Sequence, residues 1–406
     1  YENEPDNPNS LNQSIVWSIF EDRDKNIWLG THGGGVNKFD RKTGKWTSFL
    51  YDPENPNSLS HNIVRVICPD AEGNLWFGTH GGGINKFDPR TGKFTRYLHD
   101  SDDSTSLIHN EIRAIYQDKS GHIWIGTYGA GLDKMVIDAG SNRAPTFVHY
   151  RNDQNNENSI SNDFVRVIYE DRAGNFWIGT EGGGLNKMDR DRSTFIRYRA
   201  DPTDSNSLNN DYIFSIHEDK DGNLWLGTWG GGINKFDVKS GIFYHYTQED
   251  GLPNDAIYGI LEDNAGNFWI STNSGLSKFN PAKKTFKNYS AEDGLQSNEF
   301  NGGSFFKSKS GELFFGGIEG FNSFYPEDIT DNPYIPPVVI TSFSKLNNEV
   351  NFEKPIYEIN KLELSYKDYV FSFQFSALDF TAPEKNMYAY KMEGLDTDWV
   401  YTDSKK

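Results

Sequence analysis

The chain has 406 residues, a formal net charge of −18 and 15% aromatic residues. The acidic balance argues against a nucleic-acid ligand, because phosphate binding needs a basic face. The single cysteine, Cys68, excludes an internal disulfide, and no run of eighteen apolar residues that could span a membrane is present.

A short apolar segment built around a tryptophan recurs along the chain. Residues 73–79 read Gly-Asn-Leu-Trp-Phe-Gly-Thr, and a weaker copy is centred on Phe314. The tryptophans of the six strong copies are Trp28, Trp76, Trp124, Trp177, Trp225 and Trp269. Successive copies are 44 to 53 residues apart. A regular period of this length indicates a solenoid, a propeller or another repeat array.

One repeat, residues 57–98, shows four short strand patterns separated by turn residues. The expected strands are 63–68, 75–79, 84–88 and 94–98, and each of the first three is followed by a Gly- or Pro-containing turn. A four-stranded sheet of this size cannot bury two faces alone. In a β-propeller such sheets stack radially, so that each sheet covers a face of its neighbour. The tryptophans would then pack between the blades.

The seventh repeat, residues 304–325, shows three strand patterns before Pro326. Tyr1 stands ten residues before Leu11, as Phe49 stands ten residues before Leu59. Tyr1 is therefore expected to end a fourth strand that completes the seventh blade, and the chain is expected to be part of a longer one. Residues 1–333 are assigned to a seven-bladed propeller.

Residues 334–406 are assigned to a second, all-β domain. Strands are expected at 338–343, 362–366 and 370–375, and a further strand with its turn at 388–396. The pattern fits the first part of an immunoglobulin-like β-sandwich, which usually needs about 100 residues. A longer chain is therefore expected to melt at a higher temperature.

The repeat, with its Gly-Asn-apolar-Trp-apolar-Gly-Thr core and a following Asn-Lys-Phe, resembles the two-component regulator propeller repeat. The segment from Tyr388 to Trp399 is similar to the motif of the Y_Y_Y domain that follows such propellers. The resemblance implies the periplasmic sensor of a hybrid two-component histidine kinase of Bacteroidetes type. It implies an oligosaccharide ligand, partner segments that cross the membrane and carry the kinase, and a homodimer in the full-length protein, with no nucleic acid.

Several short motifs have simple structural explanations. The Gly-Gly-Gly runs lack a following Gly-Lys-Ser/Thr, so turns are favoured over phosphate loops. The segment 219–222 lacks the further carboxylates of a calcium loop, and a capped turn is favoured. The nine histidines show no zinc spacing. No metal, cofactor or catalytic residue is expected.

The candidate ligand-binding residues occupy two positions at which the repeats differ from one another. At the start of the first strand these residues are Trp17, Arg65, Arg113, Arg166, Phe214, Tyr258 and Asn301. After the second strand they are His32, His80, Tyr128, Glu181, Trp229, Asn273 and Ile318. Because strands alternate in direction within a blade, both sets are expected at one mouth of the central channel.

Aromatic faces beside arginine donors suit sugars, which present apolar C–H faces and many hydroxyls. We expect stacking on sugar rings by Trp17, Phe214, Tyr258 and Trp229. The three arginines from successive blades would attract a carboxylated or sulfated sugar. The alternative is an ordinary rim in which arginine stacks on aromatic rings. Two other functions remain open: a lyase of the streptogramin-inactivating type, which would use His32, His80 and Glu181 with a divalent ion, or a protein-interaction scaffold.

Overall fold

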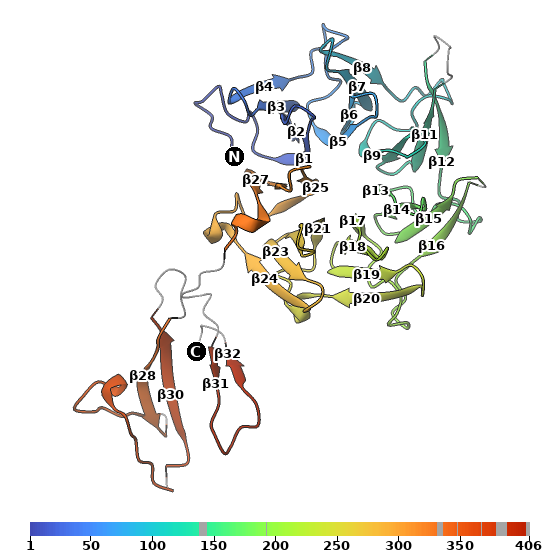
Figure 1. Cartoon of the computed structure of the whole chain (residues 1–406). Helices are drawn as coiled ribbons and strands as arrows, with labels where there is room; N and C mark the ends of the chain where they lie inside the picture. The colour runs from blue at the N-terminus through green and yellow to red at the C-terminus, as the bar shows by residue number, and fades with distance from the viewer. Residues whose placement is uncertain are drawn as a thin grey trace. The chain divides into compact units, whose positions relative to one another are not determined.

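The computed structural model (Figure 1) describes residues 1–137, 144–191, 193–330, 336–346, 348–366, 368–378 and 388–402. The chain divides into two compact units, Tyr1–Ile329 and Thr330–Lys406. The expected boundary at 333/334 lies outside the described residues. Helix accounts for 3% of the residues and strand for 48%, so the predicted all-β class is confirmed.

Seven small antiparallel sheets surround a common centre in unit 1, and the first strand of each sheet is innermost (Figure 1). The innermost strands are β1 (Val16–Glu21), β5 (Val64–Pro69), β9 (Ile112–Gln117), β13 (Val165–Glu170), β17 (Ile213–Glu218), β21 (Ile257–Glu262) and β25 (Phe300–Lys307). The second strands are β2 (Ile27–Thr31), β6 (Leu75–Thr79), β10 (Ile123–Thr127), β14 (Phe176–Thr180), β18 (Leu224–Thr228), β22 (Phe268–Thr272) and β26 (Leu313–Gly317). We number the blades 1 to 7 in this order.

The outer strands complete the blades. The third strands are β3 (Val36–Asp40), β7 (Ile84–Asp88), β11 (Leu132–Val136), β15 (Leu185–Asp189), β19 (Ile233–Asp237), β23 (Gly275–Asn280) and β27 (Gly320–Phe324). The fourth strands are β4 (Lys45–Phe49), β8 (Lys93–Tyr97), β12 (Thr146–Tyr150), β16 (Thr194–Tyr198), β20 (Ile242–Tyr246) and β24 (Thr285–Tyr289). Short 3-10 helices η1 (Gln248–Asp250) and η2 (Ala291–Asp293) precede blades 6 and 7, and η3 (Pro326–Asp328) follows blade 7. The predicted seven-bladed propeller is confirmed.

Tyr1 takes the fourth-strand position of blade 7, as the repeat spacing predicted. Its backbone nitrogen donates to the Phe321 carbonyl and its carbonyl accepts from the Phe321 amide, both at 3.0 Å. Phe49 pairs with Val36 at the equivalent place in blade 1. The Tyr1 ring also stacks on Phe321, with ring centroids 4.6 Å apart. The first residue of the chain therefore pairs with and packs on the last blade, and this contact joins the two ends of the ring.

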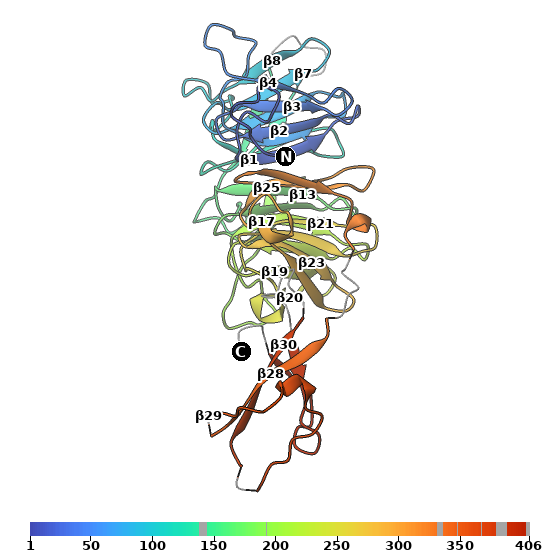
Figure 2. The same cartoon turned by 90° about the vertical axis from the view of Figure 1, so that its left-hand side faces the viewer.

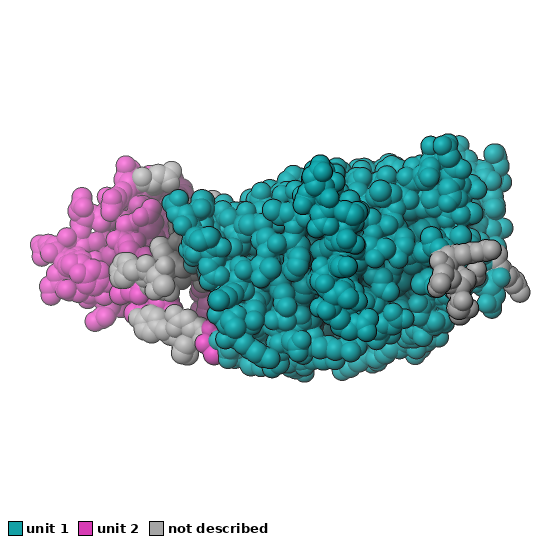
Figure 3. All heavy atoms as spheres, turned by 90° about the horizontal axis from the view of Figure 1, so that it is seen from above, with its two compact units in different colours: residues 1–329 teal, residues 330–406 magenta. Residues whose placement is uncertain are grey.

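Unit 2 (magenta in Figure 3) holds two small antiparallel sheets in its described part. One sheet has the order β29-β28-β30, and Figure 2 shows β28 and β30 side by side. The other pairs β31 with β32. The bounds are β28 (Val338–Lys345), β29 (Asn348–Glu349), η4 (Ile356–Glu358), β30 (Phe371–Ala377), β31 (Tyr388–Tyr390) and β32 (Val400–Thr402).

The strand predicted at 362–366 in unit 2 is wrong. Leu362 and Leu364 alternate with polar residues as in a strand, but the structure assigns this segment no strand. Alternation shows only that a segment can fit a pleated sheet. A strand also needs a neighbour that pairs with its backbone, and 362–366 pairs with neither small sheet of this unit.

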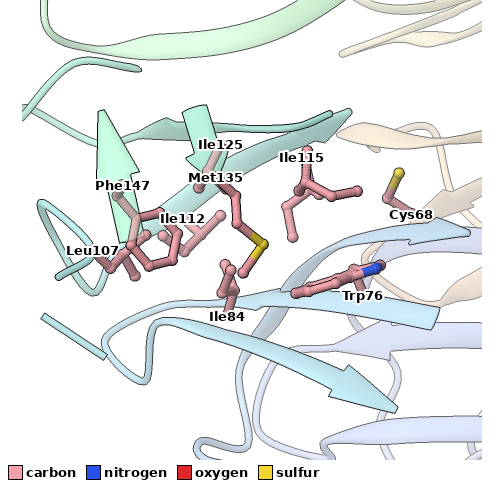
Figure 4. Close-up of a cluster of buried hydrophobic side chains, with 10 residues drawn as sticks. Cys68, Trp76, Ile84, Leu107, Ile112, Ile115, Ile125, Met135 and Phe147 are labelled. Carbon is pink, nitrogen blue, oxygen red and sulfur yellow. The ribbon is translucent and has the colours of Figure 1, made fainter. Parts of the chain in front are cut away.

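The buried core of the described residues is divided among clusters that lie between neighbouring blades. Trp76 and Ile84 of blade 2 form one buried cluster with Ile112, Ile115 and Phe147 of blade 3 (Figure 4). The corresponding contacts recur around the ring. Each repeat tryptophan is at most 2% exposed. The predicted ring of inter-blade packing by tryptophan is confirmed.

The turn between the first two strands explains the Asp-x-x-Gly-Asn-x-Trp spacing. Asp219 Oδ1 accepts hydrogen bonds from the backbone nitrogens of Asp221 (2.9 Å) and Asn223 (3.0 Å). Its Oδ2 accepts from Trp225 Nε1 at 2.9 Å. The same carboxylate–indole bond, 2.8 to 3.1 Å long, joins Asp22–Trp28, Asp70–Trp76, Asp118–Trp124, Asp171–Trp177 and Asp263–Trp269. The segment 219–222 is thus a capped turn, as predicted.

Candidate functional site

A β-bulge lies at the start of the first strand in blades 1 to 6. In blade 2, Val64 pairs with Thr79 and Val66 pairs with Gly78, so Arg65 is the extra residue between them. A bulge bends the strand and redirects the side chain at the inserted position. The other inserted residues are Trp17, Arg113, Arg166, Phe214 and Tyr258. The first of the two predicted sets therefore coincides with the bulges.

The second predicted set follows the second strands and lies beside the bulges. Trp17 Nε1 donates to His32 Nδ1 at 3.2 Å, and the Tyr258 hydroxyl donates to Asn273 Oδ1 at 3.3 Å. Isolated backbone bridges tie most of these loop residues to the next blade: His32 to Ile63, His80 to Glu111, Tyr128 to Phe164, Glu181 to Tyr212 and Trp229 to Ala256. We call the end of the channel formed by both sets the bulge mouth.

Arg166 reaches across the bulge mouth from blade 4 to blade 7. Its Nη2 donates to the Gly302 carbonyl at 3.0 Å, and its guanidinium lies over the Phe214 ring at 4.6 Å. Glu181 Oε1 is 3.8 Å from its Nε. A Cβ at position 302 would meet Arg166 Nη2 and the Phe214 ring, so a larger residue there would displace the Arg166 guanidinium. Burial lowers the pKa of Arg166 to about 10, although Glu181 opposes the shift.

Arg113 has an internal carboxylate partner. Its Nη2 lies 2.9 Å from Glu111 Oε1, and the same oxygen lies 2.7 Å from His80 Nδ1. The guanidinium also covers the Tyr128 ring at 4.4 Å. Glu111 thus joins two of the predicted site residues. The predicted stacking of arginine on aromatic rings is present, so one face of Tyr128 is occupied within the protein.

Arg65 has a different environment from the other two arginines. Its guanidinium lies 3.7 Å from the centre of the Trp17 ring. No carboxylate of the described residues forms an ion pair with it, and its Nε is buried without a hydrogen-bond partner. Burial first, and then the like charges of Arg113 and Arg166, lower the pKa of Arg65 to about 9. The side chain therefore remains cationic at neutral pH.

The opposite side of the bulge mouth is aromatic. Phe214 lies 6.0 Å from Tyr258 and 6.2 Å from Trp229, between ring centroids. Trp229 is 52% exposed and contacts Tyr212, which is 41% exposed. Of the four predicted stacking residues, Trp17 and Phe214 each have a face covered by arginine, whereas Trp229 is open.

Sequence reasoning missed several residues of this mouth: Glu111, Phe164, Tyr212 and Gly302. The first three stand just before the first strand, two residues ahead of the bulge. That position also differs between repeats, so the same comparison could have found them. Phe164 packs edge-on against Tyr128, with centroids 4.7 Å apart. No local signal marks Gly302, because its partner comes from a distant blade.

The other end of the channel holds a cavity of about 500 Å³ with a largely apolar lining. Phe20, Ile67, Phe305 and Phe306 contribute to it, together with Cys68. Burial raises the pKa of the Cys68 thiol to about 12, so the thiol is protonated at neutral pH. This cavity lacks the mixture of cations and open aromatic rings that the bulge mouth has.

The three residues proposed for a lyase centre already have separate partners. His32 accepts from Trp17, His80 approaches Glu111, and Glu181 lies beside Arg166. Within the described ranges, no group of three or more His, Cys, Asp or Glu side chains is placed to hold a metal ion.

The family profile of the two-component regulator propeller matches residues 10–33, 58–81, 106–129, 159–182, 207–230 and 251–274. The chain carries two-component regulator propeller repeats. Each match includes a bulge residue, a repeat tryptophan and a loop residue of the mouth. The regulator repeat thus contains both the inter-blade core and the variable positions.

Two relatives of these regulator repeats are signalling proteins. The crystal structure of the extracellular domain of the putative hybrid two component system BT3049 from B. thetaiotaomicron is similar, with a TM-score of 0.76 and 31% identity. The match covers 99% of this chain and 52% of that chain. Histidine kinase P4 of Formosa agariphila is 34% identical over 142 residues, which are 33% of this chain and 10% of that protein. The chain spans about half of the first and a tenth of the second.

A more distant likeness concerns the fold alone. Virginiamycin B lyase from Staphylococcus aureus has a TM-score of 0.57 and 15% identity, over 78% of this chain and 96% of that chain. No helix of the described residues is long and apolar enough to cross a membrane.

Proposed function

We propose that this chain is the extracytoplasmic sensor part of a two-component signalling protein and that it binds an oligosaccharide at the bulge mouth. The likeness to the extracellular domain of BT3049, at 31% identity over nearly the whole chain, supports the sensor role. A periplasmic location follows from that role. In the full-length protein, a membrane-spanning segment and a histidine kinase would receive the signal, and a homodimer would transmit it.

The single observation that favours a sugar is the pairing of open aromatic rings with charged donors and acceptors at one mouth. Trp229 and Tyr212 offer apolar faces for sugar C–H groups, and Asn273 and Glu111 offer polar atoms for hydroxyls. Ligand sites combine such an apolar surface with a few placed polar groups. The chain itself would perform no catalysis, since the histidines and carboxylate required for a lyase centre are engaged elsewhere.

An oligosaccharide array followed by calorimetry tests this function. We expect Trp229→Ala to weaken binding of the selected saccharide roughly two- to tenfold, because an aromatic contact contributes about 0.5–1.5 kcal/mol. Tyr244→Ala is a matched control, because Tyr244 is also exposed, at 49%, but lies on β20 at the outer side of blade 5. It should leave the affinity unchanged.

Three outcomes would overturn the proposal. Unchanged affinity in both Trp229→Ala and Tyr212→Ala would remove the bulge mouth as the site. Turnover of the bound molecule would favour a lyase. Absence of small-molecule binding across the array would favour a protein-interaction scaffold.

A further inference from the structure

We infer that the ligand of the bulge mouth carries a carboxylate or sulfate group and that Arg65 binds this group directly. The inference rests on the proposed binding role of the mouth and narrows its ligand to an anionic saccharide. It depends on an unequal distribution of internal partners among the three arginines.

Two of the three arginines have internal acceptors. Arg113 is paired with Glu111 at 2.9 Å. Arg166 has the Gly302 carbonyl at 3.0 Å and Glu181 at 3.8 Å. Their charges are therefore offset within the protein, and their positions are fixed by contacts that already exist without a ligand.

Of these three arginines, Arg65 is the one with no acceptor among the described residues. Two carboxylates, those of Glu111 and Glu181, favour the charged form of Arg65. They are the same carboxylates that Arg113 and Arg166 contact. Arg65 Nε has no hydrogen-bond partner although it is buried. Arg113 Nε is also without a partner, but the Nη2 of that side chain has Glu111. A buried donor without an acceptor is unfavourable. The Nη groups of the same guanidinium, which have no hydrogen-bond acceptor among the described residues either, are the donors that a ligand would pair with.

The contact with Trp17 prepares Arg65 for an anion. Stacking at 3.7 Å engages the flat face of the guanidinium and leaves the N–H groups at its edge for hydrogen bonds. That edge has the fork geometry that matches the two oxygens of a carboxylate or sulfate. Lysine at this position could not reproduce either feature. The geometry thus favours an oxyanion over a neutral hydroxyl.

His32 provides an independent reporter of occupancy. Burial, followed by the charge of Arg65 and then His80, lowers the pKa of His32 below its ordinary value of 6.5. An anion on Arg65 would offset that charge and raise the pKa of His32. Histidine NMR signals therefore report binding at Arg65 without any assumption about signalling.

The test uses the whole 406-residue chain and two probes that differ only at one carbon, glucuronate and glucose, with inorganic sulfate as a third. We expect glucuronate and sulfate to shift the Trp17 indole signal and to raise the pKa of His32, whereas glucose does neither. Arg65→Gln should weaken glucuronate binding roughly ten- to a hundredfold. Arg65→Lys should restore only part of it, because it retains the charge without the fork.

Arg90→Gln is the matched control, because it removes the same charged group from an exposed outer turn, where Arg90 pairs with Asp88. It should leave glucuronate binding unchanged. If Arg65→Gln does not fold, the wild-type comparison of glucuronate with glucose, read at His32, still decides the question.

Equal binding of glucose and glucuronate, or full glucuronate binding by Arg65→Gln, would overturn the inference. A neutral oligosaccharide that binds through Trp229 and ignores Arg65 would leave the proposed function intact and remove this inference. Sulfate binding at Arg65 without any saccharide binding would support anion binding by Arg65 and remove the proposed oligosaccharide-binding function.

Discussion

At the level of single residues, the indole N–H of the repeat tryptophan explains why an aspartate stands six positions before it. A buried indole needs an acceptor, and the turn aspartate provides one while it caps its own turn. In blade 7 both members change: Ser308 replaces the aspartate and Phe314 replaces the tryptophan. Phenylalanine has no N–H to satisfy, so the loss of the carboxylate leaves no donor unpaired.

Trp76→Ala should lower the free energy of unfolding by about 3–5 kcal/mol, because it opens a cavity between blades 2 and 3 and removes the donor to Asp70. Chemical denaturation followed by far-UV circular dichroism measures the change. Trp229→Ala removes the same side chain at an exposed position and should change stability by less than about 0.5 kcal/mol. Equal losses in the two variants would contradict a specific structural role for Trp76.

His32 should titrate below pH 6.5. Its burial and the charge of Arg65 disfavour the protonated ring, and Nδ1 must be unprotonated to accept from Trp17. Because the folded pKa is lower than the unfolded value, the resulting stabilisation is present above about pH 6.5 and is lost as the pH falls through the folded pKa. His32 is only partly buried and its side chain remains accessible to solvent, so NMR titration is a better measurement than unfolding.

Arg65→Gln removes one cause of the His32 shift and should move the pKa of His32 upward, toward 6.5. Arg90→Gln should leave it unchanged. A pKa for His32 at or above 6.5 in the unliganded wild-type protein would refute this description of the bulge mouth.

At the level of elements, glycine in the second strand lets the next blade approach. A Cβ at Gly78 would lie 2.5 Å from Val66 Cγ1 and 2.6 Å from Ile112 Cγ2, the latter in blade 3. Blade 6 reverses the arrangement: Ser271 stands in the second strand, and Gly259 faces it from the first. One small residue at this crossing is therefore enough, and either strand can supply it.

Gly78→Ala should destabilise the propeller by about 1–3 kcal/mol, because the added methyl group overpacks the crossing. Thermal unfolding would show the loss. Ser271→Ala is the matched control: its Cβ is already accommodated, and its Oγ is buried without a partner, so stability should change little. An unchanged melting temperature in Gly78→Ala would show that neighbouring blades accommodate the added methyl group without a loss of stability.

At the level of the whole molecule, closure of the ring depends on residues more than 300 positions apart. Tyr1 stacks on Phe321 and approaches Phe39 at 5.6 Å. It thus bridges blade 7 to blade 1, where Val16 and Leu29 pack beside Phe314. Blade 7 has three strands of its own, and Tyr1 pairs with the third of them at Phe321.

Tyr1→Ala should lower the free energy of unfolding by about 1–3 kcal/mol, since it removes the stacked ring at the closure and retains the backbone pairing. Denaturant unfolding would measure this change. Tyr244→Ala, on an exposed outer strand, should have a much smaller effect. If the two variants unfold alike, the Tyr1 ring does not contribute to closure.

The sequence by itself determined the number of blades, the strands of each blade and the burial of the tryptophans, because each repeat carries the same local turn and packing signals. It also located the variable positions at the bulge mouth, since strand direction fixes which loops share an end. Tertiary structure decided which of these residues pair: Arg166 with Gly302 across the ring, Arg113 with Glu111, and Arg65 with Trp17 alone. Two of these contacts, Arg166 with Gly302 and Arg65 with Trp17, join separate blades, and their geometry depends on the curvature of the closed ring. No repeat encodes that curvature locally.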